Sequence, residues 1–310
     1  MTAACSPFLF DPEDRAIVEA VQPLLGRQKA SKSLTTRFHP ALHPNGIKEM
    51  AAPRELRVAY AIMRLLDRLE AGQSQERLDA LRSVRDEVLH CSSGAMHLNT
   101  GRVLLQLMKD LIRSPDEQQQ LELAHDFRQA STGKPRLIRS LLKRYHLLEM
   151  PEDWSQIAFD SHVHDANTKG RKTPTHLIMD SWIKGIRFLT VVHYNHLNQE
   201  AAAELLEAAA IMDVEVRIGI EVPAAFHDRF VNFIWCPRGF DDTQDFLAFM
   251  DSPPVRAWMD EGRKVSDYIR DGVLQVLEAF NQKHLPPLNE ELGLELPDLD
   301  PNEFLDYVGM

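Results

Sequence analysis

Two histidines separated by a single residue, His162 and His164, are the clearest candidates for chemistry in this sequence. They stand at the end of a strand-like run, Gln156–Val163, and alternation along a strand sends residues i and i+2 to the same side. The two imidazoles are therefore expected to converge at the carboxyl end of a strand, where the active sites of α/β barrels lie. Imidazole nitrogen is a favoured ligand of zinc and similar ions. The pair predicts a metal site, and two solvated side chains at a strand end are the alternative interpretation.

The segments that follow alternate between strand-like and helical patterns, which predicts a parallel α/β sheet or barrel. The strand-like runs are Gln156–Val163, Ile186–His193, Val214–Val222 and Phe230–Trp235, and helical patterns near Pro174–Ile183 and Gln199–Met212 separate the first three. The second run leads into His193-Tyr194-Asn195-His196, and the third ends in Gly219-Ile220-Glu221-Val222. Each strand of the series therefore ends in a residue of ligand type.

This succession resembles the PHP (polymerase and histidinol phosphatase) family of metallohydrolases. The family motifs are D-x-H-x-H, a strand ending in T-D-H, and a strand ending in G-x-E. The matching segments here are Asp160–His164, Tyr194-Asn195-His196 and Gly219–Glu221, within residues 157–235. The resemblance implies a PHP-type (βα) barrel, of which this chain would hold an incomplete portion.

The resemblance also implies a ligand set and a chemistry. His162 and His164 would hold one metal ion, Glu221 would bridge two, and His196 would serve a further site. The ions would be zinc, manganese or iron, and clustered cations activate a bound water. The family hydrolyses phosphate esters, and some members remove nucleotides from DNA. A small-molecule phosphorylated substrate is therefore expected.

Other residues near the motifs are expected to support the site. Where family members carry an S-D-G turn, this chain has Thr168-Lys169-Gly170, and we interpret Lys169, with Arg171, as contacting a substrate phosphate. A solvated basic loop is the alternative. The residues expected beside the ligands, rather than as ligands, are Asp160, His193, Asn195 and His227.

Several departures from the family pattern leave other functions open. Asn195 replaces the Asp of T-D-H, Asn232 stands where a further histidine is expected, and asparagine is a poor zinc ligand. The closing motifs are missing, and four strands are too few for the family's seven-stranded barrel. Either a missing C-terminal region or an oligomer partner completes the barrel, or the domain is degenerate. The alternatives are a non-catalytic binding or regulatory protein with a degenerate metal site, and an amidohydrolase-type barrel, which also opens with H-x-H.

Residues 1–150 show a different pattern, with apolar residues at helical spacing and no strand signal. The expected helices are Pro53–Gly72, one from Ser74, Thr100–Ile112, one opened by Ser114-Pro115 and reaching Gln129, and Pro135–Leu148. We therefore expect an all-α accessory domain in residues 1–150 and the metal-binding α/β domain in residues 151–310. The proline-marked segment Glu149–Trp154 is the expected boundary.

Composition and charge narrow the classes of protein and of binding partner that fit this sequence. The chain has 310 residues, 44% of them hydrophobic, and no uncharged apolar run long enough to span a bilayer. Its three cysteines form no C-x-x-C pair and its N-terminus has no basic segment before an apolar stretch, so a cytoplasmic protein is expected. Residues 151–310 carry 13 Lys and Arg against 28 Asp and Glu. That acidic balance argues against a broad nucleic-acid surface.

Overall fold

The computed structural model describes residues 10–22, 54–90, 94–153, 158–168 and 170–308. It is a mixed α/β protein with one four-stranded sheet, which confirms the predicted class at that level. The chain divides into two compact units. The first comprises Met1–Phe159, Thr175–Phe188 and Glu207–Glu215, and the second comprises Asp160–Pro174, Leu189–Leu206 and Val216–Met310. Because segments beyond residue 150 group with the helical unit, a separate domain of residues 1–150 stays a prediction.

Helices make up the described part of the chain before Phe159. They are α1 (Pro12–Val21), α4 (Arg54–Ala71), α5 (Ser74–Val84), the π-helical turn η2 (Arg85–His90), α6 (His97–Arg113), α7 (Glu117–Ser131) and α8 (Pro135–Arg144). The apolar stripe of α6 is buried, including Val103, Leu104 and Leu107. Helix α7 starts later than the Ser114-Pro115 pattern predicts, because the Asp116 carboxylate accepts a hydrogen bond from Gln119 N at 2.8 Å and caps the helix there.

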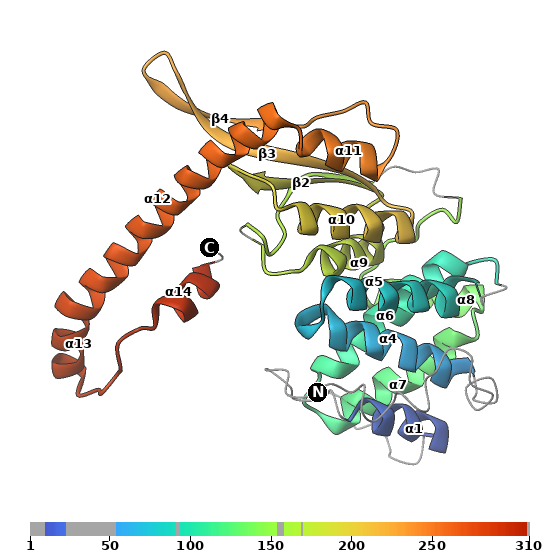
Figure 1. Ribbon diagram of the computed structural model, residues 1–310. Helices are drawn as coiled ribbons and strands as arrows, with labels where there is room; N and C mark the ends of the chain where they lie inside the picture. The colour runs from blue at the N-terminus through green and yellow to red at the C-terminus, as the bar shows by residue number, and fades with distance from the viewer. Residues whose placement is uncertain (1–9, 23–53, 91–93, 154–157, 169, 309–310) are drawn as a thin grey trace. The chain divides into compact units, whose positions relative to one another are not determined.

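The sheet has the strand order β1-β2-β3-β4 (Figure 1). Its strands are β1 (Phe159–Val163), β2 (Phe188–Tyr194), β3 (Glu215–Phe226) and β4 (Arg229–Trp235). Helix α9 (Pro174–Lys184) connects β1 to β2, and α10 (Gln199–Met212) connects β2 to β3. All four strands overlap the expected strand-like runs, although Gln156 and Ile157 of the first run lie outside the described residues. Strand β3 continues four residues past the expected end at Val222, because it pairs with β4 as far as Phe226, so Glu221 lies within the strand and not at its end.

The last two strands form an antiparallel hairpin, which the alternating pattern did not predict. The register pairs Glu221 with Ile234, Pro223 with Asn232 and Phe226 with Arg229. The turn residues His227 and Asp228 both have positive φ, 45° and 58°. Two central residues with positive φ define the type I′ turn, whose twist matches that of paired strands. The hairpin pairs Asn232 of β4 with Pro223 of β3, so the Asn232 side chain can reach Glu221, two residues earlier on β3.

Four helices follow the hairpin: α11 (Thr243–Met250), α12 (Pro253–Lys283), α13 (Leu285–Leu292) and α14 (Pro301–Val308). Helix α12 is 31 residues long, and Met259 and Leu277 are its buried residues. Figure 1 shows it as one continuous helix. Aromatic contacts hold its first turns, where Trp258 meets Trp235 of β4 edge to face at 5.1 Å between ring centroids. None of the described helices combines the length and the apolar character that a membrane span requires.

Candidate metal centre

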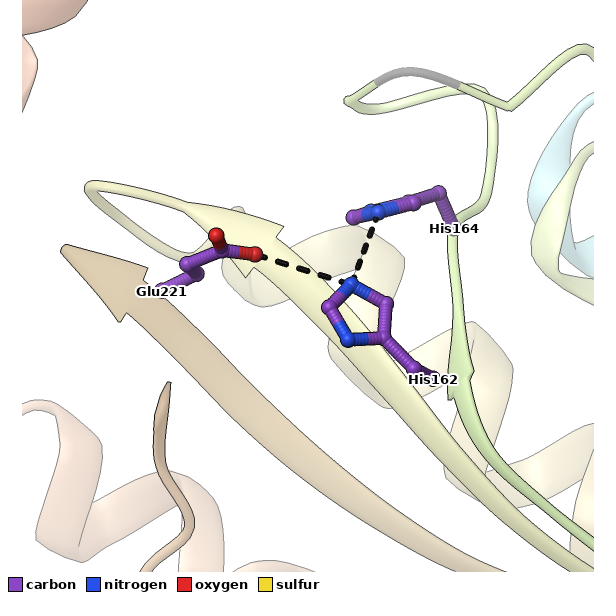
Figure 2. Close-up of side chains that lie close together, drawn as sticks. All are labelled: His162, His164 and Glu221. Carbon is purple, nitrogen blue, oxygen red and sulfur yellow. Dashed lines mark hydrogen bonds and ion pairs between the residues drawn. The ribbon is translucent and has the colours of Figure 1, made fainter. Parts of the chain in front are cut away.

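Three side chains of the second unit converge to form a candidate metal centre (Figure 2). His162 belongs to β1, His164 follows directly after it, and Glu221 lies on β3. His162 Nε2 is 3.2 Å from His164 Nε2 and 3.6 Å from Glu221 Oε2. One potential ligand atom from each of the three residues lies within 4.8 Å of the others. The end of β1 and the middle of β3 therefore bring Glu221 to two histidines that lie 57 and 59 positions earlier in the chain.

The spacing of these atoms fits a single cation of the zinc class. Zinc binds imidazole nitrogen and carboxylate oxygen at roughly 2.0–2.1 Å in tetrahedral geometry. Ligand atoms around such an ion are then about 3.3–3.4 Å apart. The observed separations of 3.2 and 3.6 Å from His162 Nε2 to its two neighbours are close to that value. Small side-chain adjustments would suffice to seat an ion.

A backbone contact fixes the orientation of the His164 ring. His164 Nδ1 lies 2.7 Å from the carbonyl oxygen of Val192 on β2. A carbonyl oxygen only accepts, so this bond requires the tautomer with its proton on Nδ1 and leaves a lone pair on Nε2, facing the cluster. The Tyr194 ring stacks on the imidazole with centroids 4.9 Å apart. His164 is thus oriented as metal-binding histidines generally are.

Glu221 gives a second indication that the cluster suits a cation. Its Oε1 accepts a hydrogen bond from Asn232 Nδ2 at 2.7 Å, whereas its buried Oε2 has no hydrogen-bond partner among the described residues. The residue as a whole is 8% exposed. A buried carboxylate oxygen without a donor is costly, and a bound cation would remove that cost.

A cavity of about 710 Å³ adjoins the cluster, and Glu221 is part of its wall. The wall also includes Asn167 and Thr168 from the loop after β1, and Tyr194, Asn195 and His196 from the end of β2. Helix α12 contributes Arg263, Ser266, Asp267, Ile269 and Arg270. This volume is within the usual range of small-molecule sites, roughly 300–1,000 Å³.

His196, the fourth predicted metal ligand, lies on the cavity wall and not in the three-residue cluster. Its Nδ1 is buried and has no hydrogen-bond partner in the described part of the chain. Burial lowers the pKa of His196, and the nearby charge of Arg263 lowers it further, against an opposing effect of Asp267. The imidazole is therefore held toward its neutral form.

The residues expected beside the ligands fall in different places. Asp160 Oδ1 accepts a hydrogen bond from His162 N at 3.3 Å, and Asn195 Nδ2 donates to Ser266 Oγ at 3.2 Å. His193 is fully buried with Nε2 3.8 Å from Asp165 Oδ2, and burial lowers its pKa while Asp165 opposes that shift. His227 is in the hairpin turn, six residues beyond Glu221 and therefore about 20 Å away along an extended strand. The structure does not bring His227 to the cluster.

The structure describes one of the two predicted phosphate-binding residues, Arg171. Lys169 lies outside the described residues. Arg171 is exposed and is not among the residues that line the cavity. The cations on the cavity wall are instead Arg263 and Arg270 of α12, which the sequence analysis missed. Their spacing, with Ser266 and Asp267 between them at i+3 and i+4, was a signal that they share one helix face.

Comparison of the chain with protein-family models, with curated proteins and with solved structures gives no match.

Proposed function

We propose that this chain is a metal-dependent hydrolase that acts on a phosphate ester. His162, His164 and Glu221 would hold a zinc, manganese or iron ion. The buried Oε2 of Glu221 carries the proposal, because it has no donor of its own and lies 3.6 Å from His162 Nε2, at a spacing that suits a shared cation.

A divalent ion bound there would stabilise charge on a phosphoryl oxygen and would activate water. The protein residues prepare the site for both tasks. The Val192 carbonyl oxygen keeps the proton of His164 on Nδ1, and Asn232 Nδ2 holds Oε1 of Glu221 so that Oε2 faces the two imidazoles. The cavity beside Glu221 gives a small substrate room to approach.

The motif resemblance supports a more specific proposal for the fold. Under it, strands β1 to β3 correspond to the opening strands of a PHP-type barrel, and the helices before Phe159 act as an accessory domain. The support for this correspondence is the order of His162-x-His164 at β1, His196 just after β2 and Glu221 on β3. A further region or a partner chain would then complete the barrel.

A non-catalytic metal-binding protein is the second candidate, and the position of Asn195 favours it. Asn195 replaces the Asp of the T-D-H motif, and its amide donates to Ser266 on α12 instead of facing the cluster. With His196 also outside the cluster, the described residues gather one set of three ligands. Three protein ligands leave a fourth position open, as catalytic zinc sites do, so it is Asn195 and not the number of ligands that favours this second candidate.

Metal analysis of purified variants tests the proposal. The chain is stripped with chelator, reloaded with zinc or manganese, freed of excess metal and analysed for metal content. We expect about one ion per chain in the unaltered protein and loss of that ion in His162→Ala and Glu221→Gln. His227→Ala is the matched control, because it removes a histidine from the hairpin turn, and it should retain the ion.

Hydrolysis of an aryl phosphate then separates the two candidates. A hydrolase should lose activity together with metal in His162→Ala and keep both in His227→Ala. A metal-loaded chain without hydrolytic activity would favour the binding protein. Equal metal content in all four proteins would overturn the metal centre itself.

A further inference from the structure

Helix α12 forms part of the cavity wall and packs directly against the backbone of Asn195. A Cβ atom on Gly262 would lie 1.9 Å from the carbonyl oxygen of Asn195, so only glycine permits this approach. One turn later, Ser266 Oγ accepts the hydrogen bond from Asn195 Nδ2. Asn195 itself has a φ of 63°, in the left-handed region that asparagine tolerates better than most residues. The turn after β2 and the helix therefore fit each other closely.

This contact orients one face of α12 toward the site. Arg263, Ser266, Asp267 and Arg270 occur at positions i, i+3, i+4 and i+7, which lie on one side of a helix, and all four line the cavity. Two guanidinium groups thus share a cavity with Glu221 of the metal centre and with His196. Along the helix axis they start about 10 Å apart, given the rise of 1.5 Å per residue.

The two arginines keep most of their hydrogen-bonding capacity. Arg263 pairs with Asp260 and Arg270 pairs with Asp267, each three residues earlier on α12. These side chains are about half exposed, and exposed pairs of this kind contribute little to stability. A guanidinium has five N–H donors, so one carboxylate contact leaves donors for an incoming anion. The opposing charges on the cavity wall are Asp267, which Arg270 partly neutralises, and Glu221 of the metal centre.

Apolar groups complete the cavity. Pro223 of β3, Ile269 of α12 and Val308 of α14 line it together with the arginines. An anionic group held by guanidinium donors would therefore have an organic group beside apolar side chains. That combination fits a small organic phosphate.

We propose that Arg263 and Arg270 form the anion-binding wall of this site and bind the phosphate group of a small phosphomonoester. The organic part of the ligand packs against Pro223, Ile269 and Val308. The assignment of the ligand as a substrate rests on the proposed hydrolase function, whereas the anion site itself depends only on the α12 wall. Guanidinium is suited to this role because its planar donors match phosphate oxygens in pairs.

Inorganic phosphate is the probe that tests the wall. Its affinity is measured by calorimetry on the zinc-loaded chain and again on the metal-free chain, with circular dichroism to confirm folding. Arg263→Gln should weaken binding about tenfold, because hydrogen bonds to a charged group are lost. Arg270→Gln should weaken it in the same direction, and Arg263→Lys should restore part of the loss. Arg256→Gln is the matched control, since Arg256 is on the same helix, pairs with Asp251 and is not a cavity residue.

The outcomes distinguish this proposal from the hydrolase proposal. Two results would contradict phosphate binding by Arg263 and Arg270, whatever the metal content. One is unchanged phosphate affinity in folded Arg263→Gln and Arg270→Gln, and the other is no phosphate binding by the zinc-loaded chain. A chain that holds no metal, but whose phosphate affinity falls in Arg263→Gln and not in Arg256→Gln, would support the wall and refute the metal centre.

Discussion

Each compact unit contains a cluster in which a histidine lies beside a carboxylate. The two clusters differ in whether a lysine of the chain pairs with that carboxylate. In the first unit, Asp180 of α9 is bonded to Lys109 of α6 and has His176 Nε2 at 3.7 Å. In the second unit, Glu221 has His162 Nε2 at 3.6 Å, and no lysine or arginine of the described chain pairs with it. Both carboxylates are nearly buried.

The difference separates a structural cluster from a candidate binding site. Lys109 is a cation that the chain itself supplies, so the first cluster is complete within the fold. The facing atoms of His162, His164 and Glu221 instead have neutral donors nearby, namely the proton on His162 Nε2 and the Tyr194 hydroxyl, which lies 3.4 Å from His164 Nε2. A buried carboxylate next to imidazoles is therefore a functional signal only where the protein provides no cation.

Replacing the lysine of the first cluster should give the largest effect. Lys109→Met leaves the Asp180 carboxylate buried without its lysine, which is expected to lower the free energy of unfolding by about 3–5 kcal/mol. The double variant Lys109→Met/Asp180→Asn should recover most of that loss. Urea denaturation of the metal-free chain measures both. Glu221→Gln should change stability by less than about 1 kcal/mol under the same conditions, because Oε2 has no donor to lose. A loss in Glu221→Gln as large as that in Lys109→Met would erase the distinction between the clusters.

Metal should stabilise the folded chain only through the second cluster. Zinc at about 100 times its dissociation constant is expected to raise the free energy of unfolding by about 2.7 kcal/mol, and chelator should reverse the change. His162→Ala should abolish this response, whereas Lys109→Met should keep it despite a lower starting stability. Thermal unfolding with and without zinc is the measurement, and a response retained in His162→Ala would contradict the assignment.

Two glycines of α12 test whether the cavity wall depends on the Asn195 contact. Gly262→Ala places a Cβ 1.9 Å from the Asn195 carbonyl oxygen and should cost about 1–3 kcal/mol through overpacking. Gly272→Ala, where no atom lies within 4 Å of the added Cβ, should stabilise the helix by about 1 kcal/mol. Both substitutions gain the same helix propensity, so the difference between their effects on the free energy of unfolding measures the contact with Asn195. Hydrogen exchange of the α12 amides measures the local stability of the helix in each variant. Equal protection in the two variants would show that α12 does not pack as described.

Local sequence patterns were sufficient to predict the ligands whose position follows from the alternation of side chains along a strand. His162 and His164 are two residues apart, and Glu221 follows an apolar run of the third strand, so alternation and element order were enough to group them. The hairpin turn was not recognised because His227 and Asp228 lack the glycine that usually marks positive φ. The bond from His164 Nδ1 to the Val192 carbonyl oxygen joins backbone and side chain across two strands, and no local pattern indicates such a contact.

Helix α12 shows the opposite limit. Apolar residues such as Val265, Ile269 and Val273 recur at helical spacing along it, but the structure buries Met259 and Leu277, so periodicity can indicate the helix without indicating what it packs against. Its place is set by Gly262 against Asn195 and by Trp258 against Trp235, which are long-range contacts. The basic residues of the cavity were consequently sought near Lys169 and Arg171, next to the histidine motif, instead of on a helix about 100 residues later.

The smallest expected effect concerns Asn232, which the sequence marked only as a departure from the family pattern. Its amide holds Glu221 Oε1 at 2.7 Å, so Asn232→Leu should leave the carboxylate free to rotate and weaken zinc binding about tenfold. Asn281→Leu is the control, because it also removes an amide hydrogen bond, to the Leu299 carbonyl oxygen, at a position outside the cavity lining. Competition with a zinc chelator measures both affinities. If Asn232→Leu binds zinc as tightly as the unaltered chain, the second cluster does not need its carboxylate oriented, and Asn232 is then only a partner that a buried oxygen requires in the metal-free state.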